Sequence, residues 1–164
     1  MKRCFLLAPL AAMALQAADV EKPRALLPLC NALGVGQKVE LKTTFPSLPD
    51  HVLNTLSLLG CRATPDKQSV TLEKNAQSRL DIDKALTRAF SRLLSPESTP
   101  REAQSITARI LDLLTAKNPS EKTMQKMIET WLPMARIKYR GHEDLTKKLE
   151  TIRRAIRPAD LGWG

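Results

Sequence analysis

Residues 81–94 read DIDKALTRAFSRLL, and the apolar side chains in this stretch recur every three or four positions. This spacing is typical of a helix that buries one face. Asp81 can cap the first turn, and Ser95-Pro96 ends the segment because the residue before a proline avoids helical backbone. We therefore expect a packed helix whose buried face consists of Ile82, Ala85, Leu86, Ala89, Phe90, Leu93 and Leu94.

Two further helices are predicted after this segment. Thr99-Pro100-Arg101-Glu102 is a capping box with proline at the first helical position, and apolar residues follow on one side as far as Leu114. We expect Asn118 to cap the next helix, in which Pro119 is the first residue and the side chain of Glu121 reaches back to the cap. Pro133 ends or kinks that helix. We assign its apolar residues to the core rather than to a binding surface: Met124, Met127, Ile128, Trp131 and Met134.

A last helix is predicted from about His142 to Arg157, where Pro158 stops it. Residues 134–140 before it fit either a strand or an extension of the kinked helix, because basic and apolar side chains alternate there. Short loops between helices favour an antiparallel bundle of about four helices over residues 75–164. The buried stripe of the last helix is Leu145, Leu149, Ile152 and Ile156.

Residues 18–74 predict a small α+β unit. A short helix ends near Gly34, and Val39, Leu41 and Thr43 alternate with charged residues as in a strand. A helix with Pro49 in its first turn follows and closes at Gly60. Residues 61–64 and 70–73 predict two more strands, joined by the turn residues 65–67. The apolar face of the middle helix consists of Val52, Leu53, Leu56 and Leu59.

The order strand, helix, strand, strand of residues 37–74 resembles that of the short N-terminal modules of secretins and TonB-dependent receptors, but it carries no diagnostic motif. The fold class that we expect is mainly α. A small α+β unit, residues 18–74, precedes a helical bundle, residues 75–164, and one continuous domain over 18–164 is the alternative.

The first 17 residues have the three zones of a secretory signal peptide. Met1-Lys2-Arg3 is positive, residues 5–15 are apolar, and small residues stand at the expected cleavage site after Ala17 or Ala18. The apolar run is shorter than the roughly 20 residues that span a bilayer, so the mature chain is expected to keep no transmembrane segment. A buried N-terminal helix of a cytoplasmic protein and a retained membrane anchor are the alternatives. The sequence has no Asn-x-Ser/Thr acceptor, because the proline in Asn118-Pro119-Ser120 excludes that site. We therefore expect a bacterial periplasmic or extracellular protein.

Cys4 would leave with the signal peptide, so the mature chain would keep Cys30 and Cys61. An even number of cysteines in an oxidising compartment predicts a disulfide, and two buried thiols are the alternative. No metal or cofactor is expected, because His51 and His142 lie far apart and no group has the spacing of metal ligands.

The sequence contains no recognisable catalytic motif. Gly-x-Ser-x-Gly is absent, and His142-Glu143 lacks the second histidine of a zinc protease. Two carboxylate pairs, Asp81 with Asp83 and Glu143 with Asp144, stand at predicted helix starts, where negative charge favours the helix dipole. We interpret both pairs as capping residues. The alternative is an enzyme acting on cell-wall material, with carboxylates assembled by the fold.

Positive charge is concentrated at the C-terminal end of a chain whose net charge is +9. A basic amphipathic helix can contact an anionic membrane, an anionic polymer or an acidic partner, and a solvated helix face is the alternative. Nucleic acid is disfavoured because aromatic residues are few and scattered. The candidate contact residues are Arg136, Lys138, Arg140, Lys147, Lys148, Arg153, Arg154 and Arg157.

Taken together, these patterns predict an exported, non-enzymatic interaction or adaptor protein. Its partner would be another protein or an anionic component of the cell envelope. Binding of anionic membranes or polymers through the basic C-terminal helix is the first alternative, and the cell-wall enzyme is the second.

Overall fold

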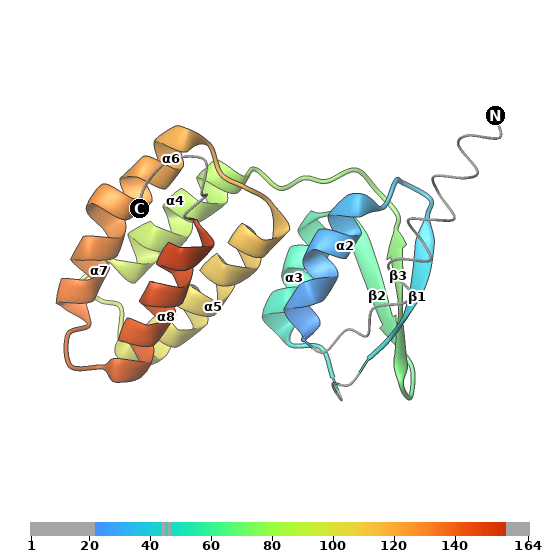
Figure 1. Cartoon of the computed structure of the whole chain (residues 1–164), viewed down its shortest axis with the longest axis horizontal. Helices are drawn as coiled ribbons and strands as arrows, with labels where there is room; N and C mark the ends of the chain where they lie inside the picture. Colours follow the sequence, from blue (N-terminus) through green and yellow to red (C-terminus); the bar gives the residue numbers. More distant parts are fainter. Residues whose placement is uncertain (1–21, 44, 46, 157–164) are drawn as a thin grey trace. The chain divides into compact units, whose positions relative to one another are not determined.

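A computed structural model describes residues 22–43, 45 and 47–156 of the chain and divides into two units, which meet between residues 79 and 80 in the sequence (Figure 1). The predicted signal peptide, its cleavage site and Arg157 lie outside the described residues. The described chain is mainly helical with one small antiparallel sheet. The predicted fold class is confirmed at this level.

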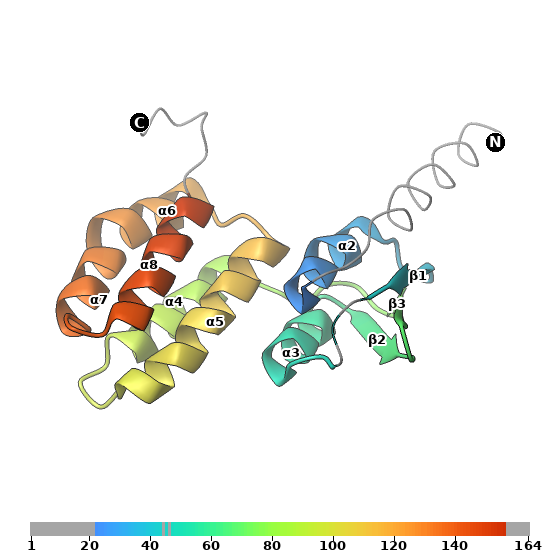
Figure 2. The same cartoon turned by 60° about the horizontal axis from the view of Figure 1, so that its bottom comes forward.

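The N-terminal unit has one short 3-10 turn, two helices and three strands. These are η1 (Pro23–Ala25), α2 (Leu26–Ala32), β1 (Lys38–Lys42), α3 (Asp50–Leu58), β2 (Cys61–Pro65) and β3 (Ser69–Lys74). The strand order is β1-β3-β2, and both pairs are antiparallel. Helix α2 packs against β3 and α3 against β2, so both helices cover one face of the sheet (Figure 2).

Alternation along the strands explains this two-layer arrangement. Val39 and Leu41 of β1 lie opposite Leu72 and Val70 of β3, and all four side chains are buried. The residues between them face the other side of the sheet and are polar. The predicted order of one strand, a helix and two strands is therefore correct, as is the short helix before Gly34.

Helix α3 differs from the prediction in two details. Pro49 has extended backbone and precedes the helix, so the helix begins at Asp50. Leu53 is 37% exposed, whereas Thr55 is fully buried and donates its hydroxyl to the carbonyl of His51 at 2.9 Å. The buried face of α3 is therefore turned toward Thr55, and Leu53 lies at its margin.

Gly60 ends α3 as predicted, and its position requires glycine. Its φ is +87°, and a Cβ there would lie 2.0 Å from the carbonyl oxygen of Ala76. The carbonyl of Gly60 accepts the N–H of Asn75 at 2.8 Å. The end of α3 is thereby fixed against the chain that leaves β3.

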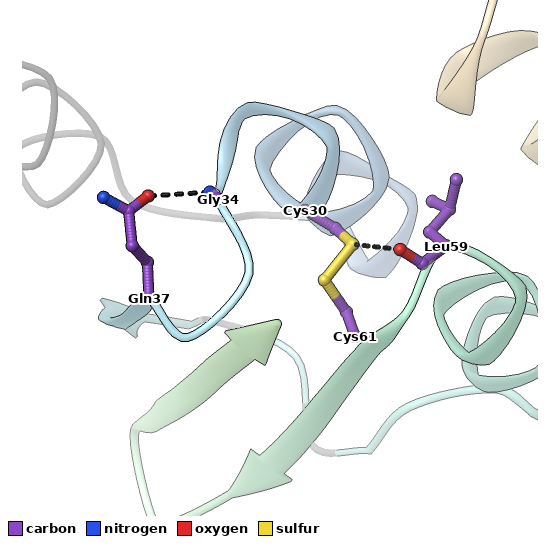
Figure 3. Close-up of a disulfide and its surroundings, with 5 residues drawn as sticks. All are labelled: Cys30, Gly34, Gln37, Leu59 and Cys61. Atoms are coloured by element: carbon purple, nitrogen blue, oxygen red, sulfur yellow. Dashed lines mark hydrogen bonds between the residues drawn. A yellow bond between two sulfur atoms is a disulfide. The ribbon is translucent and has the colours of Figure 1, made fainter. Parts of the chain in front are cut away.

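The disulfide predicted between Cys30 and Cys61 is confirmed, with an S–S distance of 2.02 Å (Figure 3). It joins α2 to the first residue of β2, and both cysteines are buried. Next to it, the turn after α2 is closed by the side-chain carbonyl of Gln37, which accepts the N–H of Gly34 at 2.7 Å. The covalent bond therefore joins the helical layer to the sheet.

In its described residues, the C-terminal unit contains helices and no strand. It consists of α4 (Ile82–Leu93), α5 (Pro100–Ala116), α6 (Glu121–Lys126), the π turn η2 (Met127–Trp131), α7 (Leu132–Lys138) and α8 (Glu143–Ala155). Helix α5 packs against α4 and α8, and α7 packs against α8. The predicted stripe of α8 is confirmed, because all four of its residues are buried.

The helix starts show where capping was predicted correctly. Asp81 accepts the N–H of Lys84, and Thr99 accepts the N–H of Glu102, both at 3.2 Å. The prediction of Asn118 as a cap is wrong, because Ser120 caps α6. The carboxylate of Asp83 in α4 accepts the N–H of Ser120 at 3.0 Å. This bond from another helix fixes the later start of α6.

Pro133 does not end its helix. It stands in the first turn of α7, directly after the π turn. A proline lacks the N–H of a regular helix, and its ring clashes with the carbonyl four residues earlier, so a local widening of the helix accommodates it. Residues 134–138 are consequently helical, and the strand interpretation is wrong.

Candidate binding surface

The π turn changes which side of its helix is buried. Met127 is buried before it, and Leu132, Ala135 and Tyr139 are buried after it. The step from Met127 to Leu132 is five residues instead of the usual three or four, because a π turn contains one extra residue. An uninterrupted helix would have buried Met134 instead. Met134 is 50% exposed, so its assignment to the core is wrong.

The exposed side of α7 carries apolar and basic side chains together. Ile137 is 65% exposed and Met134 is 50% exposed, and Arg136 and Arg140 are exposed beside them. We call Pro133, Met134, Arg136, Ile137 and Arg140 the α7 surface. No acidic residue occurs between Leu132 and His142, and the two charged members of the α7 surface are both basic.

A shallow hollow of about 440 Å³ lies on the α7 surface. Its lining consists of Pro133, Arg136, Ile137, Arg140, Gly141 and Thr146. Gly141 has a φ of +92° and begins the turn into α8, which supplies Thr146. The hollow therefore combines two guanidinium groups, a hydroxyl and an exposed isoleucine, without a carboxylate. Such a lining suits an anionic group next to an apolar one.

Lys138 has a different environment from its basic neighbours. Its ammonium donates to the carbonyl of Ser95 and lies 5.3 Å from the ring centre of Tyr139. The hydroxyl of Tyr139 donates to the carbonyl of Leu93 at 2.7 Å. These two bonds attach the end of α7 to the end of α4 and to the loop that follows it.

The candidate residues of α8 lie on a helix of mixed charge. Lys147, Arg153 and Arg154 are exposed and Lys148 is half-buried. The same helix carries three acidic residues, and Arg154 lies 4.0 Å from the carboxylate of Glu150. Two of the predicted contact residues, Arg136 and Arg140, line the same hollow.

The acidic residues that could have served catalysis lie mainly at helix starts. The N–H of Ser120 holds the pKa of Asp83 below its ordinary value of 3.8. Asp81 caps α4, and Glu143 and Asp144 are in the first turn of α8. Within the described part of the chain, no three His, Cys, Asp or Glu residues are grouped so that they could hold a metal ion.

Comparison with known proteins gives no match. No protein family matches the chain, no curated protein is similar to it, and no solved structure matches it. The resemblance of residues 37–74 to secretin and TonB-dependent receptor modules therefore rests on the order of the elements alone. Across the described residues, no helix has the length and apolar character needed to cross a bilayer.

Sequence reasoning missed the apolar half of the α7 surface. The spacing of the apolar residues could have indicated it. These residues form one buried stripe only if a five-residue step is allowed: Met127, Leu132, Ala135 and Tyr139. That step leaves Met134 and Ile137 on the opposite side.

Proposed function

We propose that the protein is an exported, non-enzymatic interaction module of the bacterial envelope. In this proposal the helical unit is an antiparallel bundle of four helices, and its α7 surface binds an acidic segment of another envelope protein. The observation that carries the proposal is the exposure of Ile137 and Met134 next to Arg136 and Arg140.

The composition of the α7 surface is that of an interface core. Methionine and arginine are enriched in protein interfaces, whereas lysine is depleted. The planar guanidinium group can hold a carboxylate through two parallel hydrogen bonds, which gives orientation as well as affinity. Ile137 and Met134 offer apolar area that a partner can remove from water at about 25 cal/mol per Å².

The shape of the surface favours a protein segment over a lipid headgroup layer. The hollow of about 440 Å³ can accept a protruding side chain, whereas a lipid surface is broad and has no such projection. The mixed charge of α8 also weakens its attraction to a uniformly anionic surface. Membrane binding is therefore an outcome of the test and not the proposal.

Site-specific crosslinking in the native envelope tests this proposal. A photoreactive amino acid at position 137 is expected to crosslink to one acidic protein, identified by mass spectrometry. The same group at position 151, an exposed site on α8, is the matched control. Arg136→Glu with Arg140→Glu should reduce the crosslink about tenfold or more, because two charge-assisted contacts are lost.

Two other results would contradict the proposal. Equal crosslinking from positions 137 and 151 would show that the α7 surface is not the contact. Salt-sensitive binding to phosphatidylglycerol vesicles, lost in the same double variant while no protein is crosslinked, would establish the anionic-membrane alternative. Mass spectrometry of the native protein tests export separately, since a chain beginning at Ala18 or Asp19 is expected.

A further inference from the structure

Strand β2 is an edge of the sheet, and the hydrogen bonds at its two ends show which of its peptide groups face outward. Gly60 accepts the N–H of Asn75, and Asp66 donates its N–H to the carbonyl of Ser69, both at 2.8 Å. In an antiparallel ladder, alternate residues bond to the neighbouring strand. The peptide groups of Arg62 and Thr64 therefore point toward β3, and those of Cys61 and Ala63 point away from it.

Pro65 is the third outward position, and it sets the length of this free edge. A proline offers a carbonyl but no N–H, and prolines in sheets are found where the missing N–H would face away from the ladder. An added strand can consequently exchange a full set of hydrogen bonds with Cys61 and Ala63 only. The free edge is short and has a fixed register.

A hollow of about 390 Å³ lies beside this edge, lined by residues of α3 and β2. Leu53, Leu56 and Ser57 line it from the helix, Ala63 from the strand, and Asn75 from the chain after β3. Both views show α3 next to β2 (Figures 1 and 2). Leu53, 37% exposed, is one of the few large apolar side chains on the described surface.

We propose that an extended segment of a partner protein adds a strand to β2 and places an apolar side chain in this hollow. Ala63 lies opposite Leu72, so its side chain is on the helix-covered face of the sheet. A partner residue opposite Ala63 has its side chain on that same face, next to Leu53. Main-chain hydrogen bonds to Cys61 and Ala63 fix the register of the added strand, and the hollow determines which partner side chain fits.

The residues on either side of that apolar position face the outer side of the sheet, where Arg62 lies. Arg62 is opposite Glu73, which in turn is opposite Lys38, so this row keeps a net positive charge. An acidic residue next to the apolar one therefore fits the edge. The position on the other side of the apolar residue lies opposite Thr64, in a row with Thr71 and Glu40, so an acidic residue is not favoured there. In an antiparallel partner strand the segment therefore has the pattern polar, apolar, acidic.

A second copy of this chain does not fit the edge as well. Its own β2 would present Ala63 and the disulfide-bonded Cys61 to the hollow, and neither can fill about 390 Å³. The proposed site lies in the N-terminal unit and uses no residue of the α7 surface. The two proposals can therefore fail independently.

Titration of the ¹⁵N-labelled, oxidised chain tests this inference. The probe is the acetylated and amidated peptide Thr-Thr-Thr-Leu-Glu-Thr-Thr, whose glutamate lies opposite Arg62 when its leucine pairs antiparallel with Ala63. We expect the largest amide shifts at Cys61, Arg62 and Ala63. The same peptide with its central leucine N-methylated should bind about tenfold more weakly or worse, because it cannot donate to the carbonyl of Ala63.

Protein variants test the edge and the hollow separately. Ala63→Pro removes the outward N–H and should weaken binding about tenfold or more, and Leu53→Ser should weaken it without disturbing the edge. Thr64→Ala, on the outer face, is the control that should bind like the original chain. If Ala63→Pro does not fold, Leu53→Ser and the N-methylated peptide still decide the question.

Three results would overturn the inference. The first is the absence of shifts at Cys61, Arg62 and Ala63 at millimolar peptide. The second is equal binding of the N-methylated and unmodified peptides. The third is a shift of the Ala63 amide with protein concentration alone, because this would identify a second copy as the occupant.

Discussion

The two units of this protein differ in what stabilises the fold of each. The N-terminal unit is built from short elements, and its helix layer is joined to its sheet by the bond between Cys30 and Cys61. The helical unit contains no cysteine and depends on longer helices with buried stripes around Phe90 and Ile110. Stability should therefore respond to redox state in one unit and to core packing in the other.

The largest expected effect is in the helical core. Phe90 is fully buried, and its ring stacks on Trp131 with centres 5.1 Å apart. Phe90→Ala should lower the free energy of unfolding by about 3–5 kcal/mol, because it leaves a cavity as well as removing buried area. Urea denaturation followed by circular dichroism measures this loss.

The matched control for that substitution is Ile137→Ala. Ile137 is 65% exposed, so its truncation should change stability by no more than about 0.5 kcal/mol. If the two substitutions lower the free energy of unfolding by similar amounts, the assignment of Phe90 to the core and of Ile137 to the surface is wrong.

A somewhat smaller effect is expected in the N-terminal unit. The two cysteines are 31 residues apart, so Cys30→Ala with Cys61→Ala should cost about 3–4 kcal/mol in the chain-entropy model. Hydrogen exchange should show faster exchange in β1 and β3, with α5 as the internal reference. If hydrogen exchange in α5 becomes faster by the same factor, the disulfide stabilises both units and not the N-terminal unit alone.

The smallest effect concerns the bond from Asp83 to Ser120. Asp83→Ala should cost about 1 kcal/mol at neutral pH, the usual value of a lost cap. The folded pKa of Asp83 is below its ordinary value, so this stabilisation is present above about pH 4 and is lost as the pH falls through the folded pKa.

Denaturation at a series of pH values measures the difference between Asp83→Ala and the original chain. That difference should shrink on acidification. Asp83→Asn keeps an oxygen acceptor without a charge, so its loss at neutral pH should be smaller. The difference in stability between the Asn and Ala variants should not depend on pH, because neither side chain titrates in this range. A loss from Asp83→Ala that is constant down to the lowest pH would exclude the charged bond to Ser120.

Local signals predicted the fold well where the structure is decided locally. Asp81 and Thr99 cap their helices as expected, because the capping atoms lie three residues from their partners. Asn118 failed as a cap because Asp83, distant in the sequence, binds the N–H of Ser120 instead. The sequence alone does not show such a contact.

The candidate surface was predicted only in part. The basic half, Arg136 and Arg140, could be found from the charge of the C-terminal region. The apolar half, Met134 and Ile137, could not be found with a regular helical period, because the π turn shifts the burial pattern by one residue. Lys138 carries the same charge as its neighbours, but its bond to Ser95 distinguishes it from them, and only the structure shows that bond.

The π turn at Met127–Trp131 also determines how this helix tolerates a change of length. One residue too many in a regular helix would rotate everything beyond it by about 100°, which would exchange a buried side for an exposed one. The wider turn absorbs that residue locally, so Leu132, Ala135 and Tyr139 stay buried. Deleting one residue within the turn should therefore leave a regular helix with the same buried stripe, and Met134 and Ile137 should stay exposed.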